Sequence, residues 1–146
     1  MDLVKRLGIE LPVIQAPMAG VQLSALTIAV CTAGGLGSLP CAMLDAAAIR
    51  REMASIRAAT DAPFNLNFFC HRTPVVDPAR DSAWRRALAP FYAEFGLDIG
   101  AVKAGPGRIP FDATSAALVE ELRPRVVSFH FGLPEHDEME RVRASG

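Results

Sequence analysis

The side chains best suited to chemistry stand near the ends of short apolar runs. Asn67 offers an amide that both donates and accepts hydrogen bonds, and His130 can act as a hydrogen-bond partner or acid/base group near neutral pH. Small residues and glycines at other run ends let a backbone approach a flat ligand closely. These residue types favour a site for a planar heterocycle, with these candidates: Ala16, Pro17, Met18, Asn67, His130 and Gly132.

Two of these residues also fit purely structural roles. Asn67 lies within an apolar run, where its amide could simply tie down a neighbouring loop, because buried polar groups are normally hydrogen-bonded. His130 stands between Phe129 and Phe131 and could be a satisfied core histidine. The sequence alone leaves both interpretations open.

Other patterns that carry chemistry give no competing site. The run Gly34-Gly-Leu-Gly37 follows a predicted helix and lacks the spacing of a dinucleotide-binding loop, so it is interpreted as a helix cap and tight turn. Cys31, Cys41 and Cys70 have no metal-ligand spacing, and no metal site is predicted. The sequence contains no Walker loop and no H-E-x-x-H motif.

The elements that must position these residues alternate in type along the chain. Continuous apolar runs bounded by turn residues predict strands, and helical periodicity predicts helices between them. This alternation is typical of an α/β protein with a parallel sheet. Strands are predicted over 11–18, 36–40, 64–69 and 126–132, helices over 24–32, 45–60, 79–95, 114–122 and 135–144, and a helical and loop excursion over about 70–111.

Composition excludes several functional classes. The 146 residues contain 15 Lys and Arg against 16 Asp and Glu, so the chain has no basic field for nucleic acid. An apolar content of 51% argues against disorder, and the apolar stretches are too short to span a membrane. The charged N-terminus has no secretory h-region, and an odd number of cysteines suits a reducing compartment. A cytoplasmic location is therefore expected.

The number of predicted strands limits the architecture. Four βα-type units occupy the chain, whereas a closed (β/α)8 barrel needs eight strands. The sequence therefore predicts either a small open sheet or half of a barrel. Half of a barrel would leave two open strand edges and an uncovered apolar face.

Four phrases in order resemble the front half of the nitronate monooxygenases, formerly called 2-nitropropane dioxygenases. The phrases are Pro12-Val-Ile-Gln-Ala-Pro-Met-Ala-Gly20, Ala33-Gly-Gly-Leu-Gly37, Pro63-Phe-Asn-Leu-Asn-Phe-Phe69 and Val127-Ser-Phe-His-Phe-Gly-Leu-Pro134. The resemblance runs over essentially all of 1–146. It implies a TIM-type (β/α)8 barrel, of which this chain supplies roughly the first four βα units, and an FMN-dependent oxidation of alkyl nitronates by O2 to a carbonyl compound and nitrite.

The resemblance also assigns roles to the candidate residues. It implies that Ala16, Pro17, Met18 and Asn67 bind FMN, with Gln15 and Gly37 nearby, and that His130 and Gly132 line the substrate pocket. The family's catalytic base stands in a Glu-Ala-Gly-Gly-His phrase that would lie beyond Gly146, so no catalytic residue is assigned here. The 146 residues alone are expected to be inactive.

Two alternatives stay open. The first is an FMN-dependent NAD(P)H reductase of quinones or enoyl thioesters on a related barrel. The second is a non-catalytic half-barrel that assembles as a homodimer through its exposed edges. The residues of this chain do not discriminate between these alternatives and the monooxygenase.

Overall fold

A computed structural model describes residues 2–102 and 107–146. The chain divides into two compact units, one formed by Met1–His71 with Arg108–Gly146 and the other by Arg72–Gly107. The predicted excursion over about 70–111 includes residues 103–106, which lie outside the described residues. Within the described ranges, no helix is both long and apolar enough to cross a membrane.

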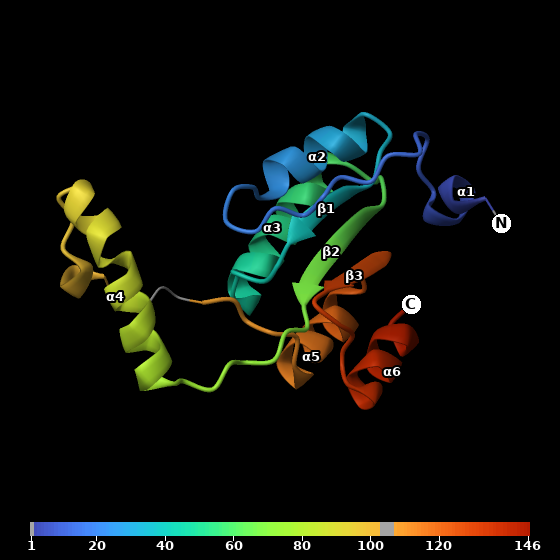
Figure 1. Cartoon of the computed structure of the whole chain (residues 1–146). Coiled ribbons are helices and arrows are strands. Elements are labelled where there is room, and N and C mark those ends of the chain that lie inside the picture. The colour runs from blue at the N-terminus through green and yellow to red at the C-terminus, as the bar shows by residue number, and fades with distance from the viewer. Residues whose placement is uncertain (1, 103–106) are drawn as a thin grey trace. The chain divides into compact units, whose positions relative to one another are not determined.

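The larger unit is built around a parallel sheet, as the alternating pattern predicts. Its strands are β1 (Gly37–Pro40), β2 (Phe64–Phe69) and β3 (Val126–His130), paired in the order β1-β2-β3. Asn65 pairs with Ser38 on one side and with Val126 on the other. The helices of this unit are α1 (Leu3–Leu7), α2 (Ser24–Thr32), α3 (Ala46–Ala59), α5 (Ala113–Leu122) and α6 (His136–Ala144) (Figure 1).

One face of the sheet forms the hydrophobic core with the helices. Leu39 of β1 and Leu66 of β2 are fully buried there. From α3, Ile49, Met53 and Ile56 pack against them, and their spacing places the three side chains on one apolar stripe of the helix. The other strand residues, one position away, must face the opposite side because side chains alternate along a strand.

The strand predicted over 11–18 is wrong. Only a single parallel bridge forms, between Ile14 and Leu36, where Gln15 N–H donates to Leu36 O and Leu36 N–H donates to Val13 O. The next bond of a parallel ladder would require an N–H at residue 17, and Pro17 has none. Proline therefore ends the pairing after one step.

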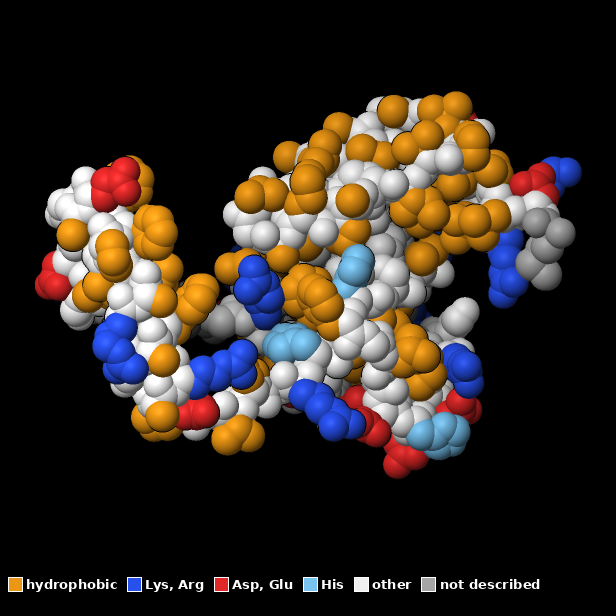
Figure 2. Space-filling view, in the orientation of Figure 1, with side chains coloured by type: hydrophobic (Ala, Val, Ile, Leu, Met, Phe, Trp, Pro, Cys, Tyr) orange, Lys and Arg blue, Asp and Glu red, His pale blue; other side chains and the backbone are white. Residues whose placement is uncertain are grey.

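This segment is also exposed rather than doubly covered. Side chains from Leu11 to Leu26 leave an apolar surface, and Figure 2 shows hydrophobic side chains gathered over α2 and the segment before it. The exposed members are Leu11, Val13, Ile14, Met18, Val21, Leu23 and Leu26.

Other predicted boundaries agree closely with the structure. The helix predicted over 45–60 is α3, capped by Asp45, whose carboxylate accepts from Ala48 N–H at 2.7 Å. The strand predicted over 126–132 ends at His130, because Phe131 and Gly132 both have positive φ. The short helix α1 was not predicted, although Asp2 caps it and Gly8 ends it in the left-handed conformation.

The smaller unit consists of α4 (Pro78–Glu94) and a 3-10 turn, η1 (Ile99–Ala101). Asp77 caps α4 by accepting from Ala79 and Arg80 N–H. No residue of α4 is buried, and Trp84, Phe91 and Phe95 are exposed.

Glu52 of α3 supplies the cap that α2 lacks. The N-cap residue of α2 is Leu23, which has no capping side chain, and Glu52 Oε2 instead accepts from Ser24 N–H at 2.9 Å. Hydrogen bonds from the Ser24 side chain, and then from its backbone, lower the pKa of Glu52. We expect Glu52→Ala to reduce the free energy of unfolding by about 0.5–1 kcal/mol, toward the low end for a lost N-cap.

The pH dependence of this cap follows from the lowered pKa. Because the folded-state pKa lies below the unfolded value, the stabilisation is complete above the unfolded pKa and is lost as pH falls through the folded one. Urea unfolding at neutral and acidic pH measures the free energy of unfolding of wild type and Glu52→Gln. The variant Glu94→Ala, which changes an exposed carboxylate, is the control. If the free energy of unfolding differs between wild type and Glu52→Gln by the same amount at every pH, the Glu52 carboxylate does not cap α2.

Candidate functional site

The face of the sheet opposite the helices is polar. Register places Ser38 beside Asn65 and Asn67 beside Ser128, so these side chains share one face. The described residues that are both polar and buried are Gln22, Thr27, Ser38, Asn65 and Asn67, and all of them lie on this face or at its β1 edge. The predicted strand over 64–69 therefore has one polar face, and the hydrogen-bond partners of its asparagines come from both neighbouring strands.

Asn65 links the three strands. Its Nδ2 donates to Ser38 Oγ at 3.1 Å and to Ser128 Oγ at 2.8 Å. Its Oδ1 is buried and has no hydrogen-bond partner among the described residues. A buried acceptor without a donor is costly, so this oxygen marks a position where a donor group is expected.

Asn67 joins β2 to β3 one layer further along. Its Nδ2 lies 2.9 Å from Ser128 Oγ, 3.2 Å from Ser128 O and 2.9 Å from His130 Nδ1. The side chain is 1% exposed, whereas His130 is exposed at the end of β3. Asn67 thus ties down a neighbouring strand rather than a loop, and the structure brings together two of the predicted site residues.

The backbone of Ser38 in β1 is hydrogen-bonded by side chains, because Pro17 has no N–H to pair with it. Gln15 Oε1 accepts from Ser38 N–H at 3.0 Å, and Ser38 O accepts from Gln22 Nε2 at 2.6 Å and from Thr27 Oγ1 at 3.1 Å. Gln15 Nε2 also donates to Gln22 Oε1 at 2.6 Å. Side-chain hydrogen bonds therefore replace the backbone ladder, and they hold the segment that contains Ala16, Pro17 and Met18 against β1.

A cavity of about 480 Å³ opens just after this segment, at the carboxyl end of β1. Gly20, with φ +86°, lies against Met43, whose Sδ would be 3.2 Å from an added Cβ. Parallel α/β proteins bind ligands at this end of their strands. The cavity is lined by Gly20, Val21, Gln22, Leu23, Pro40, Met43 and Leu44.

Backbone strain marks the end of β3. Phe131 has φ +66°, which is a genuine outlier for a bulky residue, and Gly132 follows with φ +122°. The Phe131 ring is exposed, and it makes an edge contact with the Phe69 ring, with 4.8 Å between the ring centroids. His71 Nδ1, beside the same rings, is buried and has no hydrogen-bond partner in the described part of the chain.

The thiols near the strand ends are unsuited to nucleophilic chemistry. Burial raises the pKa of Cys41 to about 12. Burial, with a smaller effect from Glu138, raises the pKa of Cys70 to about 11. Both thiols therefore stay protonated near neutral pH, and the thiolate is the reactive form. The described residues also contain no group of three His, Cys, Asp or Glu side chains that could hold a metal ion.

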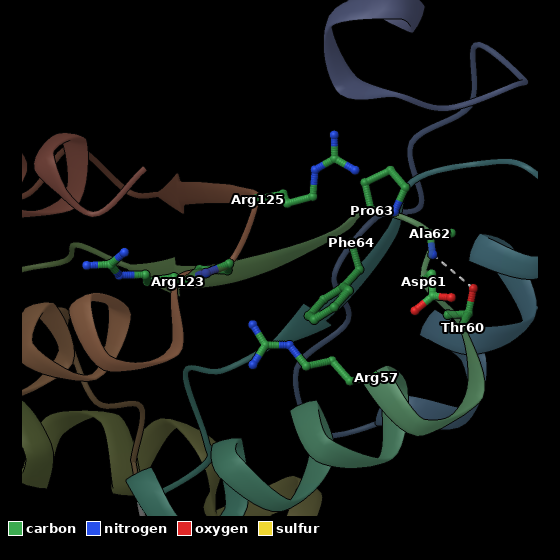
Figure 3. Close-up of a pocket in the computed structure, with 9 residues that line it drawn as sticks. Arg57, Thr60, Asp61, Ala62, Pro63, Phe64, Arg123 and Arg125 are labelled. Atoms are coloured by element: carbon green, nitrogen blue, oxygen red, sulfur yellow. Dashed lines mark hydrogen bonds between the residues drawn. The ribbon is translucent and has the colours of Figure 1, made fainter.

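A second hollow, of about 310 Å³, lies at the opposite end of the strands (Figure 3). Arg57, Arg123 and Arg125 line it, but Figure 3 shows their guanidinium groups pointing in different directions. Arg57 donates to Leu122 O at 2.6 Å, near the end of α5. This contact serves a helix C-terminus, where a cation is favourable.

The sequence identified some of this site and missed the rest. Asn67 and His130 are in contact, whereas Ala16, Pro17 and Met18 lie at the β1 edge and Gly132 lies beyond the end of β3. Ser128 was missed, although its position between residues 126 and 130 on one face could have revealed it. Gln22 lies outside any strand and gave no periodic signal.

A parallel sheet with buried amides on one face and a cavity at its strand ends defines the class: a parallel α/β protein, in which ligands generally bind at the carboxyl ends of the strands.

Comparison with known proteins identifies the family. The profile of the nitronate monooxygenase family matches residues 2–146. The nitronate monooxygenase of Paraburkholderia phytofirmans is 43% identical over 146 residues, which cover 99% of this chain and 40% of that protein. The nitronate monooxygenase of Pseudomonas aeruginosa is 44% identical over 142 residues, which cover 96% of this chain and 40% of that protein. The chain belongs to the nitronate monooxygenase family, a family of enzymes, and spans about 40% of these relatives.

Solved structures agree with this assignment. A structure described as nitroalkane oxidase from Streptomyces ansochromogenes matches with a TM-score of 0.79 and 31% identity, over 99% of this chain and 40% of that one. FabK from Thermotoga maritima matches with a TM-score of 0.60 and 22% identity, over 96% of this chain and 34% of that one. This likeness shows a shared fold alone. The resemblance predicted from the four sequence phrases is confirmed.

Proposed function

We propose that this chain forms the N-terminal part of an FMN-dependent nitronate monooxygenase, which oxidises alkyl nitronates with O2 to a carbonyl compound and nitrite. The observation that carries the proposal is the family match over residues 2–146, together with relatives of that name at 43% and 44% identity. In this proposal the three strands and the bridged segment before them are roughly the first four strands of a (β/α)8 barrel.

The site residues fit a flat, hydrogen-bonding cofactor. The cavity at the end of β1 lies just after the Ala16–Met18 segment, and the buried Asn65 Oδ1 has no donor among the described residues. We assign Ala16, Pro17, Met18 and Asn67 to cofactor binding, and His130 and Gly132 to the substrate pocket. When bound, FMN supplies the redox chemistry, and the protein orients it and tunes it through hydrogen bonds.

This chain's own residues have three tasks in the proposal. The Gln15–Ser38–Gln22 hydrogen bonds hold the Ala16–Met18 segment beneath the cofactor in one conformation. Asn67, fixed between β2 and β3, keeps His130 at the rim of the site. The exposed Phe131 ring, held by the strained backbone against the Phe69 ring, offers an apolar surface next to His130.

The proposal is tested on the protein as its source cell makes it. We expect an intact mass well above 15.6 kDa, bound FMN, reduction of the flavin by an alkyl nitronate without O2, and nitrite release when O2 is admitted. The corresponding neutral nitroalkane is the matched control.

Two outcomes would overturn the proposal. Reduction of the flavin by NAD(P)H but not by the nitronate would favour the quinone or enoyl reductase. A flavin-free, compact homodimer of 15.6 kDa chains would favour the non-catalytic half-barrel.

A further inference from the structure

The amide orientation of Asn67 is fixed by the backbone of β3. An asparagine amide can be built in two orientations that differ only in exchanging nitrogen and oxygen. Here the atom assigned as Nδ2 lies 3.2 Å from the carbonyl oxygen of Ser128. A carbonyl oxygen only accepts hydrogen bonds, so the atom that faces it must be the nitrogen. The alternative would place two oxygens against each other in a buried site.

With the nitrogen fixed, the proton of the neighbouring imidazole is also located. Asn67 Nδ2 carries two hydrogens, one for Ser128 and one directed at His130 Nδ1, which is 2.9 Å away. A hydrogen bond to Nδ1 requires a lone pair there, and neutral imidazole then carries its proton on Nε2. The contact that would favour the opposite tautomer, from Nδ1 to Asn67 Oδ1, is longer at 3.2 Å.

The free nitrogen of His130 is available to a ligand. His130 is exposed at the end of β3, and its Nε2 makes no hydrogen bond within the described residues. In the tautomer set by Asn67, this nitrogen is a donor and has no lone pair in the ring plane. It can therefore hold a carbonyl or oxyanion oxygen, and it cannot accept a proton from a substrate.

We propose that Asn67 is a positioning residue that keeps neutral His130 in its Nε2–H tautomer, so that His130 recognises a ligand oxygen as a hydrogen-bond donor and does not act as a base. This inference deepens the proposed function, and rests on it for the statement that the pocket takes a nitronate, whose oxygens are acceptors. The tautomer itself follows from the contacts among Asn67, Ser128 and His130.

Nitrogen NMR of the imidazole rings tests the tautomer without flavin or substrate. The full protein is labelled with ¹⁵N-histidine, and the ring signals of His130 are assigned by their loss in His130→Gln. Two-bond ¹⁵N–¹H correlations at mildly alkaline pH distinguish a protonated ring nitrogen from an unprotonated one. We expect wild-type His130 to carry its proton on Nε2. A proton on Nδ1 would overturn the proposal, whatever the result for nitronate oxidation.

Two substitutions separate positioning from a purely structural role. Asn67→Asp replaces the donor by an acceptor of nearly the same shape, and we expect it to move the His130 proton to Nδ1. Ser128→Ala is the matched control, because it removes the hydroxyl but keeps the carbonyl that orients Asn67, and we expect the Nε2–H tautomer to persist. An unchanged tautomer in folded Asn67→Asp would contradict the proposal. If that variant does not fold, the wild-type spectrum still decides.

Discussion

Leu66→Ala is expected to reduce the free energy of unfolding by about 2–5 kcal/mol, the range for deleting a buried leucine side chain. Leu66 is fully buried at the centre of β2, between Leu39 of β1 and Val127 of β3 in the sheet register. Its side chain faces the helices, so truncation leaves a cavity bounded by strands on both sides and by the core residues of α3 and α5. Such a rigid boundary relaxes little.

Urea unfolding followed by circular dichroism measures this effect as a lower midpoint with an unchanged slope. Leu3→Ala is the matched control, because Leu3 is 57% exposed and its loss should change stability by less than about 0.5 kcal/mol. If Leu66→Ala does not fold, Leu66→Val should remain measurable, at a cost of about 1 kcal/mol. Equal midpoints for the variants at positions 66 and 3 would mean that the core does not lie on this face.

The helices after α1 were predictable because their signals are local. The apolar stripe of α3 and its Asp45 cap lie within about four turns of sequence, and tertiary packing only had to confirm them. The two faces of β2 were also visible, since Leu66 and Asn67 alternate with a period of two. Local pattern and tertiary environment agree at these positions.

The features that sequence reasoning missed depend on partners far along the chain. The apolar run 11–18 predicts a strand, but the ladder also requires an N–H at residue 17, and Pro17 lacks one. The replacement bonds from Gln15 and Gln22 to Ser38 join residues 23 and 16 positions apart. No periodicity encodes such pairs. The strained φ of Phe131 was equally hidden, because a bulky residue gives no sequence signal for that conformation.

Gly37 shows how an ambiguous sequence signal is resolved by packing. The resemblance placed Gly37 near the cofactor, and its neighbours favoured a turn. In the structure an added Cβ would lie 2.3 Å from Thr27 O and 2.8 Å from Cys31 Sγ. Both atoms belong to α2, so the missing side chain lets α2 lie directly against β1. Gly37 therefore serves the contact between helix and sheet.

Gly37→Ala is accordingly expected to reduce the free energy of unfolding by about 1–3 kcal/mol, the usual cost of overpacking, or by more. The larger cost would arise because the obstructing Thr27 oxygen belongs to the backbone, so α2 must move as a whole. Gly100→Ala is the control: its nearest neighbour is the Asp98 carboxylate, 3.1 Å from an added Cβ, and this flexible side chain can shift slightly while it keeps its hydrogen bond from Gly100 N–H. Denaturant midpoints compare the two. Where Gly37→Ala still folds, its flavin content per folded chain should equal that of wild type. A normal midpoint with reduced flavin content would instead return Gly37 to the cofactor site.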